Sequence, residues 1–198
     1  MSDPEDGPPG DSAGAPEDKG PAVRSELPLY REPWVRFAVS FALIVSVFEA
    51  VYHGIALETQ VFHRFLELLA SASALLLTPF YESVGTLSTR ISTNRFVVTV
   101  DYGCDGIQVC TLLTAAILAF PARWRDKLAG IVLGNLWLQM WNVVRISSLV
   151  VIGGIRSTFF EPTHVYIWPT ILVALCLATW IAWARWTTPD DAPQPATV

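Results

Sequence analysis

Charged residues are scarce in this chain: they make up 16% of its 198 residues, against about a quarter in an average soluble domain. Hydrophobic residues make up 52%, and eight of the residues are tryptophan. The acidic residues crowd the first 26 positions, so the formal net charge of −5 says little about the rest of the chain. Basic patches interleaved with aromatic residues are also missing, so we expect no nucleic-acid partner. The composition favours a protein embedded in the lipid bilayer.

Cysteine is also rare, with only Cys104, Cys110 and Cys176 present. No C-x-x-C or Cys/His spacing typical of zinc occurs, so we expect neither a disulfide framework nor a metal or other cofactor. The motifs G-x-S-x-G and H-E-x-x-H are absent, which leaves serine hydrolases and zinc proteases without support. Cys110 and Cys176 lie inside apolar runs and are predicted to be small buried residues. Cys104 differs, because it lies at the edge of such a run.

No signal peptide is recognisable, since residues 1–26 are rich in Pro, Gly, Asp and Glu and have no basic start leading into an apolar core. Such a composition is typical of disorder. We therefore expect a disordered acidic tail over 1–33 and a second disordered tail over 187–198. Residues 34–186 between them are predicted to form one membrane-embedded domain.

Long apolar runs dominate that domain. The runs 34–57, 106–120, 128–152 and 165–186 are predicted to be membrane helices. The run 61–80 is short and apolar on one face only, so we favour an interfacial or half-buried helix there over a full span. The predicted fold is an all-α polytopic membrane protein with four to five membrane helices, the number depending on whether 61–80 is interfacial or spans.

Residues 81–105 are the polar part of the domain. Within them, 86–91 and 95–100 are rich in β-forming residues and are joined by 92–94. This pattern predicts a small β-hairpin.

Basic residues predict the orientation. The linker 121–127 holds Arg123, Arg125 and Lys127 against one acid, and short basic loops stay cytoplasmic. The helix that starts at 106 then begins at the outer face, which places Cys104 and the hairpin outside. The C-terminus is predicted to be cytoplasmic.

The same orientation brings three residues to one face. Arg145 lies 17 residues along the run that begins at 128, roughly 26 Å from its inner end and so near the outer surface. His164 opens the last helix, again outside. If 61–80 spans, the N-terminus is outside rather than inside, but Cys104 is outside in both cases.

Cys104, Arg145 and His164 together suggest acyl transfer. A thiol attacks as thiolate, and the positive end of the following helix favours an anion. Asp101 and Asp105 oppose this, unless Asp105 is occupied in capping the helix. Cysteine with histidine forms a nucleophile and base, while an arginine can hold an oxyanion or a carboxylate.

Other interpretations of these residues stay open. Cys104 could be an ordinary small residue and His164 an interfacial cap. Arg145 could extend outward to anchor its helix, with Asn142 one turn away to orient it. In a non-catalytic scaffold or small-solute carrier, Arg145 would pair with an acid such as Asp101 or Asp105.

Three segments resemble the exosortase/archaeosortase family: "GCDGI" (103–107), "NVVRI" (142–146) and "PTHVY" (162–166). The stretch "AAILAFPARWRDKLAGIVLG" (115–134) is most similar to the short exosortase H group. The resemblance covers roughly residues 35–186, with fewer spans than in the longer members.

The resemblance implies a membrane cysteine transpeptidase, with Cys104 as nucleophile and Arg145 and His164 as its partners. Its substrates would be exported proteins with a C-terminal sorting tail, made of a short motif, a membrane helix and a basic end. Cleavage would proceed through a thioester at the outer face of the bacterial inner membrane. The recognition motif, the choice between hydrolysis and transfer, and the oligomeric state are left open.

Overall fold

Helices form most of the structure, a computed structural model that describes residues 32–54 and 59–188. The helices are α1 (Pro33–Gly54), α2 (Gln60–Leu77), α3 (Ile107–Ala119), α4 (Trp124–Ile155), α5 (Phe160–Pro162) and α6 (Trp168–Thr187). Four helical stretches are long and apolar enough to cross a membrane: α1, α2, α4 and the continuous run Ser157–Thr187. The prediction of a mostly helical protein with several potential membrane helices is confirmed. The predicted tails fall largely outside the described residues.

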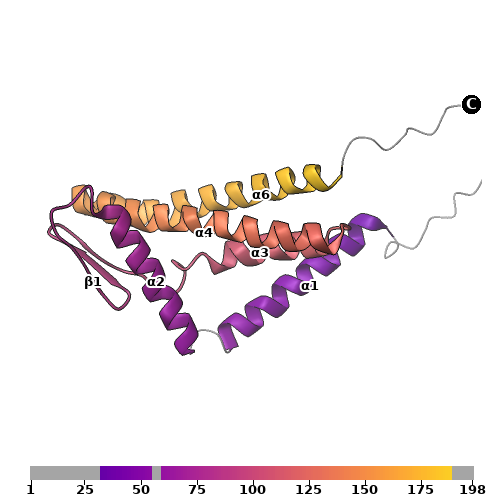
Figure 1. Ribbon diagram of the computed structural model, residues 1–198, viewed down its shortest axis with the longest axis horizontal. Coiled ribbons are helices and arrows are strands. Elements are labelled where there is room, and N and C mark those ends of the chain that lie inside the picture. The colour runs from indigo at the N-terminus through magenta and orange to yellow at the C-terminus, as the bar shows by residue number, and fades with distance from the viewer. Residues whose placement is uncertain (1–31, 55–58, 189–198) are drawn as a thin grey trace, which may run out of the picture.

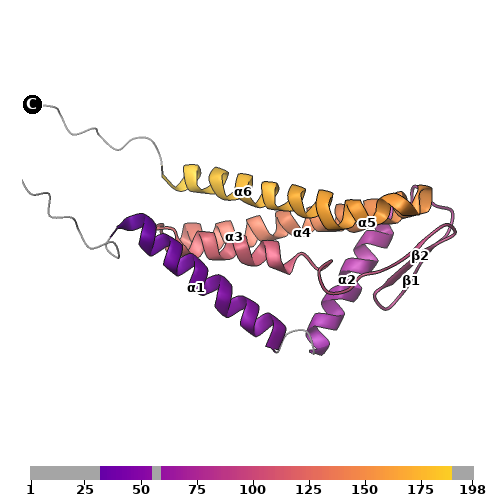
Figure 2. The same cartoon turned by 180° about the vertical axis from the view of Figure 1, so that it is seen from behind.

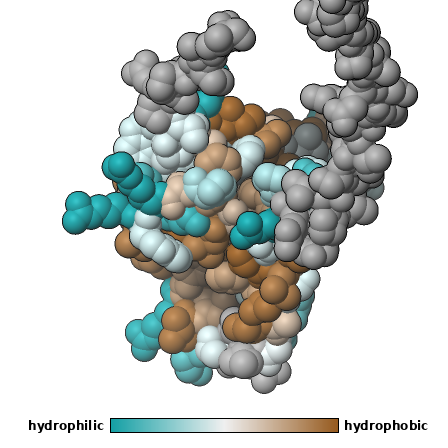
Figure 3. Space-filling model, turned by 90° about the vertical axis from the view of Figure 1, so that its right-hand side faces the viewer, coloured by the Kyte–Doolittle hydropathy of each residue, from teal (hydrophilic) through white to brown (hydrophobic). Residues whose placement is uncertain are grey.

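Helices α3, α4 and α6 lie along the long axis of the molecule, with α1 oblique to them (Figures 1 and 2). The start of α1, the α3–α4 link and the end of α6 meet at one end, here called the linker end (Figure 1). The opposite end, which carries the sheet and α5, is called the sheet end. Figure 3 views the linker end, where hydrophilic side chains project between apolar ones. Arg36, Arg123, Arg125 and Arg185 are exposed there.

Glycines allow close packing in the linker half. A Cβ on Gly130 would lie 2.3 Å from the indole nitrogen of Trp183, and one on Gly134 would lie 2.6 Å from Leu113. Small residues let helix backbones approach where lipid supplies no hydrophobic drive to association. The resulting core contains Leu113, Ile117, Leu138, Cys176 and Trp183, with Cys110 packed against it. The predicted packing role of Cys176 and Cys110 fits this arrangement.

Helix α2 is one-sided, as its sequence indicated. Its buried residues lie on one face: Phe62, Leu66, Leu69, Ala70, Ser73, Ala74 and Leu77. That face packs on α4 and on the sheet, and the helix diverges from the bundle axis in both views (Figures 1 and 2). Its length and hydropathy also suit a span. Its interfacial position stays a prediction.

The sheet has three antiparallel strands, in the order β1–β2–β3, rather than the two of the predicted hairpin. The strands are β1 (Val84–Leu87), β2 (Arg90–Thr93) and β3 (Val97–Thr99). The predicted first strand, 86–91, in fact contains a turn, at which Ser88 adopts φ = 54°. Ile91, Val98 and Val100 are buried and attach the sheet to α2 and α4.

Helix α4 is longer than a membrane requires. Its 32 residues extend about 48 Å, whereas the hydrocarbon core is about 30 Å thick. It begins before and ends after the predicted range 128–152. Its C-terminal half packs against α2 and the sheet. Helix α3, with 13 residues, is about 20 Å long and does not cross the core alone. The loop before α3 therefore lies part-way along α4.

The last helical run begins earlier than predicted. A 3-10 turn (Ser157–Phe159) leads into α5, followed by a π-helical turn (Thr163–Ile167) and then α6. His164 thus lies inside a continuous helical run rather than at its opening, which corrects the sequence-based expectation.

Candidate functional site

A tight loop, residues 101–106, presents Cys104 between β3 and α3. Gly103 (φ = 83°) and Gly106 (φ = 72°) adopt left-handed conformations that other residues rarely take. The Cys104 N–H donates to the Asp101 carbonyl at 2.9 Å, which closes a turn. The two glycines of "GCDGI" therefore fold the chain sharply on either side of the thiol.

Asp105 holds this loop together and is almost fully buried. Its Oδ1 accepts the N–H of Ile107, the first residue of α3, at 2.7 Å. Its Oδ2 accepts the Tyr52 hydroxyl at 2.5 Å and the Gly103 N–H at 3.3 Å. The condition set from the sequence, that Asp105 be occupied at the helix start, is met. Its two oxygens accept these three hydrogen bonds, and they fix the carboxylate inside the loop.

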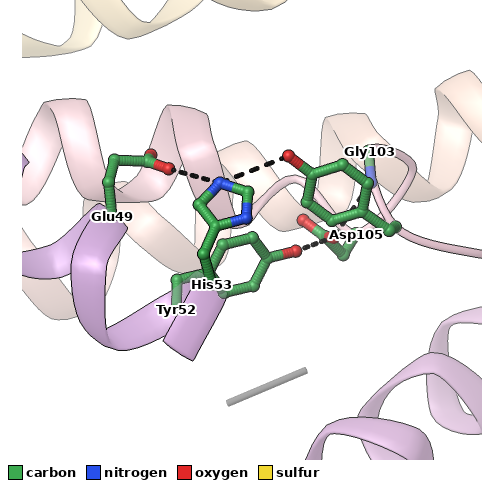
Figure 4. A network of polar contacts seen from close by, with 6 residues as sticks. Glu49, Tyr52, His53, Gly103 and Asp105 are labelled. Carbon is green, nitrogen blue, oxygen red and sulfur yellow. Dashed lines mark hydrogen bonds and ion pairs between the residues drawn. The ribbon is translucent and has the colours of Figure 1, made fainter. Parts of the chain in front are cut away.

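The last turn of α1 supports the loop from the side (Figure 4). Tyr52 stacks on Tyr102, with ring centroids 5.8 Å apart. His53 Nε2 lies 3.2 Å from Glu49 and 3.4 Å from the Tyr102 hydroxyl. Tyr52 is the single buried residue of α1, which also packs along α3 and contacts Trp180 of α6 through Phe37.

Helix α4 supports the loop from the other side. Asn142 Nδ2 donates to the Cys104 carbonyl at 2.9 Å, and Gln139 Nε2 donates to the Asp105 carbonyl at 2.9 Å. A Cβ on Gly106 would lie 2.9 Å from the Asn142 amide, so glycine is needed there for this approach. Asn142 therefore positions the cysteine loop. Its Nδ2 binds the Cys104 carbonyl rather than Arg145, which it was predicted to orient.

Cys104 and His164, 60 residues apart in the chain, meet at this loop. The Cys104 Sγ lies 3.1 Å from His164 Nε2, and only 8% of Cys104 is exposed. His164 is held by the π-helical turn, and its ring contacts Phe160 at 5.7 Å between centroids. π-Turns are uncommon and frequent at functional sites.

Arg145 is buried beside them, with 5% of its surface exposed. None of the ion pairs among the described residues includes it, and its Nε has no hydrogen-bond partner there. It lines a small cavity of about 160 Å³ between α3 and α6, together with Gly103, Asp105 and Gly106. A buried guanidinium with free hydrogen-bonding capacity is available to bind an anionic group.

The charges around Cys104 act in opposite directions. Burial is the largest effect and raises the pKa of the Cys104 thiol. The positive charge of Arg145 lowers that pKa, whereas the Asp105 carboxylate raises it. Because burial raises the pKa of the thiol, its attack on a substrate requires a base to take the proton.

Cys104 and His164 both face a cavity of about 410 Å³ at the sheet end. The other residues that line it are 96 to 100, which include strand β3, then Ile146 and Leu149 of α4, and Phe160 and Glu161 of α5. The structure thus brings two of the three predicted residues into contact, and places Arg145 near enough to influence the thiol. Tyr52 and Gln139 were not predicted, because they act on backbone and loop atoms that leave no sequence motif.

No protein-family model, curated protein or solved structure matches this chain. Within the described residues, no three His, Cys, Asp or Glu side chains gather as a metal site would need.

Proposed function

We propose that this chain is an exosortase-like membrane cysteine peptidase that cleaves the C-terminal sorting tails of exported proteins. The observation that carries the proposal is the 3.1 Å contact between Cys104 Sγ and His164 Nε2 at the wall of an open cavity. This is the distance expected of a nucleophile and its general base. The family resemblance of the three sequence segments supplies the substrate class.

Each group has a defined part in the reaction. The unprotonated Nε2 of His164 takes the thiol proton as Cys104 Sγ attacks the carbonyl carbon of the scissile peptide bond. The tetrahedral oxyanion collapses, the C–N bond breaks, and the leaving amine takes the proton back from His164. A thioester on Cys104 remains, which water or an acceptor amine then resolves.

Arg145 supplies the positive charge for this reaction. Its charge favours the thiolate at Cys104. Its unpaired Nε leaves donor capacity for the oxyanion or for a substrate carboxylate. A buried cation that is not used by a structural ion pair is costly in a membrane, which favours a functional role.

The molecule's two ends support an orientation for the reaction. Arg36, Arg123, Arg125 and Arg185 are exposed at the linker end. Arg90, Arg95 and Arg156 are exposed at the sheet end, but Glu82 and Glu161 are exposed there too, so the linker end is the more basic of the two. Cys104 lines a cavity with β3, towards the sheet end. With the basic end cytoplasmic, the cavity opens at the outer face of a bacterial inner membrane. A substrate's membrane helix would lie in the bilayer and its basic end would remain inside.

A scaffold or carrier in which Arg145 pairs with Asp101 or Asp105 has less support. Asp105 already accepts hydrogen bonds from Tyr52, Gly103 and Ile107. Neither acid forms an ion pair with Arg145 in the described part of the chain.

The test is tail cleavage in membranes. An exported reporter from the same organism, ending in a motif, an apolar helix and a basic tail, is produced together with the protein. We expect Cys104→Ala and Cys104→Ser to abolish cleavage, because a serine hydroxyl is a poor nucleophile in a site built for a thiol. Cys176→Ala, in the linker-half core, is the matched control and should cleave normally. Full cleavage by Cys104→Ala at equal protein level would refute the proposal.

A further inference from the structure

One edge of the sheet is free along the cavity. Strand β3 pairs with β2 on one side, and it is the last strand in the sheet order. The hydrogen bonds Val100 N to Thr89 O and Thr93 N to Phe96 O fix the alternation. The even-numbered residues 96, 98 and 100 therefore direct their backbone groups to β2, and Val97 and Thr99 direct theirs away from it.

The cavity lies along this edge. Residues 96 to 100 line it, together with the apolar side chains of Ile146 and Leu149 of α4 and of Phe160. Cys104 and His164 line the same cavity. The groove therefore combines unpaired backbone donors and acceptors, apolar side-chain contacts and a nucleophile.

We propose that the substrate segment before the scissile bond binds as an added strand on the free edge of β3, parallel to it. This inference deepens the proposed function and rests on it. An extended peptide satisfies the backbone groups of Val97 and Thr99, whereas the apolar lining of the cavity contacts its side chains. Recognition of this kind takes its affinity from main-chain hydrogen bonds and its specificity from alternate side chains.

The course of β3 fixes the parallel direction. Its beginning lies at the sheet end, because Phe96 packs on Gly153 near the end of α4, where a Cβ would lie 2.3 Å from the ring. Its end leads towards Cys104, whose carbonyl is bound by Asn142, three turns earlier in α4. A substrate with its globular part outside and its tail helix in the bilayer runs the same way, from the sheet end towards the membrane.

The residues that line the groove determine which substrate segments can bind before the scissile bond. It must be extended and free of proline at the residues that face Val97 and Thr99, since proline lacks the N–H. Apolar side chains suit the wall formed by Ile146, Leu149 and Phe160. Glu161, also in the lining, disfavours acidic residues near it.

The test uses peptide electrophiles and needs no natural substrate. Acetyl-Val-Ala-Ala chloromethyl ketone alkylates a thiol to give a thioether and chloride. Its twin carries N-methyl groups on all three amide nitrogens, so it has no N–H to donate to the strand edge. Labelling of Cys104 in the full-length protein in membranes is followed by mass spectrometry. We expect the parent to react faster, by a factor of about 2 to 10 for each hydrogen bond lost in the twin.

Two proline variants localise the effect. Thr99→Pro removes an outward N–H on the cavity edge, and edge strands tolerate proline there. Thr86→Pro makes the same change on the opposite edge. Ile91 lies opposite Thr86 in β2 and directs its backbone groups to β3, so Thr86 directs its own groups outward. Thr86 is exposed and does not line the cavity. Iodoacetamide, too small to pair with a strand, reports on the thiol itself.

Support requires that Thr99→Pro removes the preference for the parent peptide, that Thr86→Pro keeps it, and that iodoacetamide labels all proteins alike. Equal labelling by parent and twin, or a preference that survives Thr99→Pro, would overturn the added strand. So would labelling by iodoacetamide with no reaction of the peptide. The proposed function fails separately, through cleavage of the reporter by Cys104→Ala.

Discussion

The two halves of α4 bury different kinds of side chain. In the linker half, Gly130, Gly134 and Leu138 are buried, and Lys127 is the one buried polar side chain. In the sheet half, three polar side chains, Asn142, Arg145 and Ser147, are buried among apolar residues. The first set brings backbones together. The second set binds carbonyl oxygens, as Asn142 does for Cys104 and Ser147 does for Ser73, or holds a charge. Because buried polar groups are costly in a membrane, their concentration in one half marks where the helix does more than pack.

The three cysteines follow the same division. Cys176 packs in the apolar core of the linker half, with Cys110 against it. Cys104 lies on a loop bound by polar side chains from α1 and α4, and contacts a histidine. The same side chain is a small apolar filler in one half and a candidate nucleophile in the other, and its surroundings make the difference.

The largest contrast that we expect between the two ends is the side of the membrane on which each lies. A cysteine introduced as Asn94→Cys, exposed in the β2–β3 turn, should react with an impermeant maleimide added to intact cells. Arg125→Cys, exposed at the linker end, should react only after the cells are opened. Both are made in a protein whose other cysteines are alanine. The reverse pattern would overturn the charge-based orientation.

His164→Ala should be the most damaging change among the partners of Cys104. The buried thiol then loses its base, and we expect cleavage to slow by the ~10²–10⁴-fold typical of general acid–base catalysis. The rate is taken from the ratio of cleaved to full-length reporter. His63→Ala, on the exposed surface of α2, is a control that should cleave normally. Equal rates in the two variants would remove His164 from the chemistry.

Arg145 allows charge and shape to be separated. Arg145→Lys keeps the charge but loses the planar fork, so cleavage should fall by roughly 10²–10³-fold, as for a lost oxyanion donor. Arg125→Lys, at the linker end, should change nothing. Full cleavage by Arg145→Lys would assign Arg145 to the scaffold.

The pH dependence of Cys104 labelling sharpens this point. Arg145 lowers the pKa of the Cys104 thiol, so Arg145→Gln should raise that pKa and move the midpoint of iodoacetamide labelling to higher pH. Arg145→Lys should leave the midpoint close to that of the unchanged protein. A midpoint that moves to lower pH in Arg145→Gln would contradict the electrostatic role.

The smallest expected difference between the two halves is that between the variants Gly106→Ala and Gly130→Ala. Gly106→Ala would force a Cβ against Asn142 and strain a left-handed backbone, so we expect a loss of about 1–3 kcal/mol in stability together with slower cleavage. Gly130→Ala would meet Trp183 instead and should lower stability while the folded fraction cleaves normally. Thermal unfolding in detergent and cleavage per folded protein separate the two. Identical effects would show that the halves are not independent.

Sequence could predict the helices because long apolar runs are unambiguous. It predicted a hairpin but missed one strand of the sheet, since the turn at Ser88–Thr89 uses none of the Gly, Asn or Asp residues that mark hairpins, and "TLSTRI" therefore resembles one strand. Ser88 has a positive φ at this turn, and its hydroxyl hydrogen-bonds to His63 and Glu67 of α2, contacts that the local sequence does not indicate.

The candidate site divides in the same way. Cys104, Arg145 and His164 were predicted together because a nucleophile, a buried cation and a histidine have chemical meaning and the topology placed them on one face. Tyr52 and Gln139 were not, because a tyrosine in an apolar helix and a glutamine in another give no sign that they meet the Asp105 loop. Such contacts depend on packing between distant segments.

The π-turn at Thr163–Ile167 gives His164 a further property. A π-turn is equivalent to one residue inserted in an α-helix, and each residue rotates a helix by about 100°. Deleting one residue from this turn would restore α-helical winding and swing His164 about a quarter-turn around the axis relative to α6. The meeting of His164 with Cys104 therefore depends on the length of the chain as well as on its composition. Along this stretch a single-codon deletion would be more harmful than most substitutions.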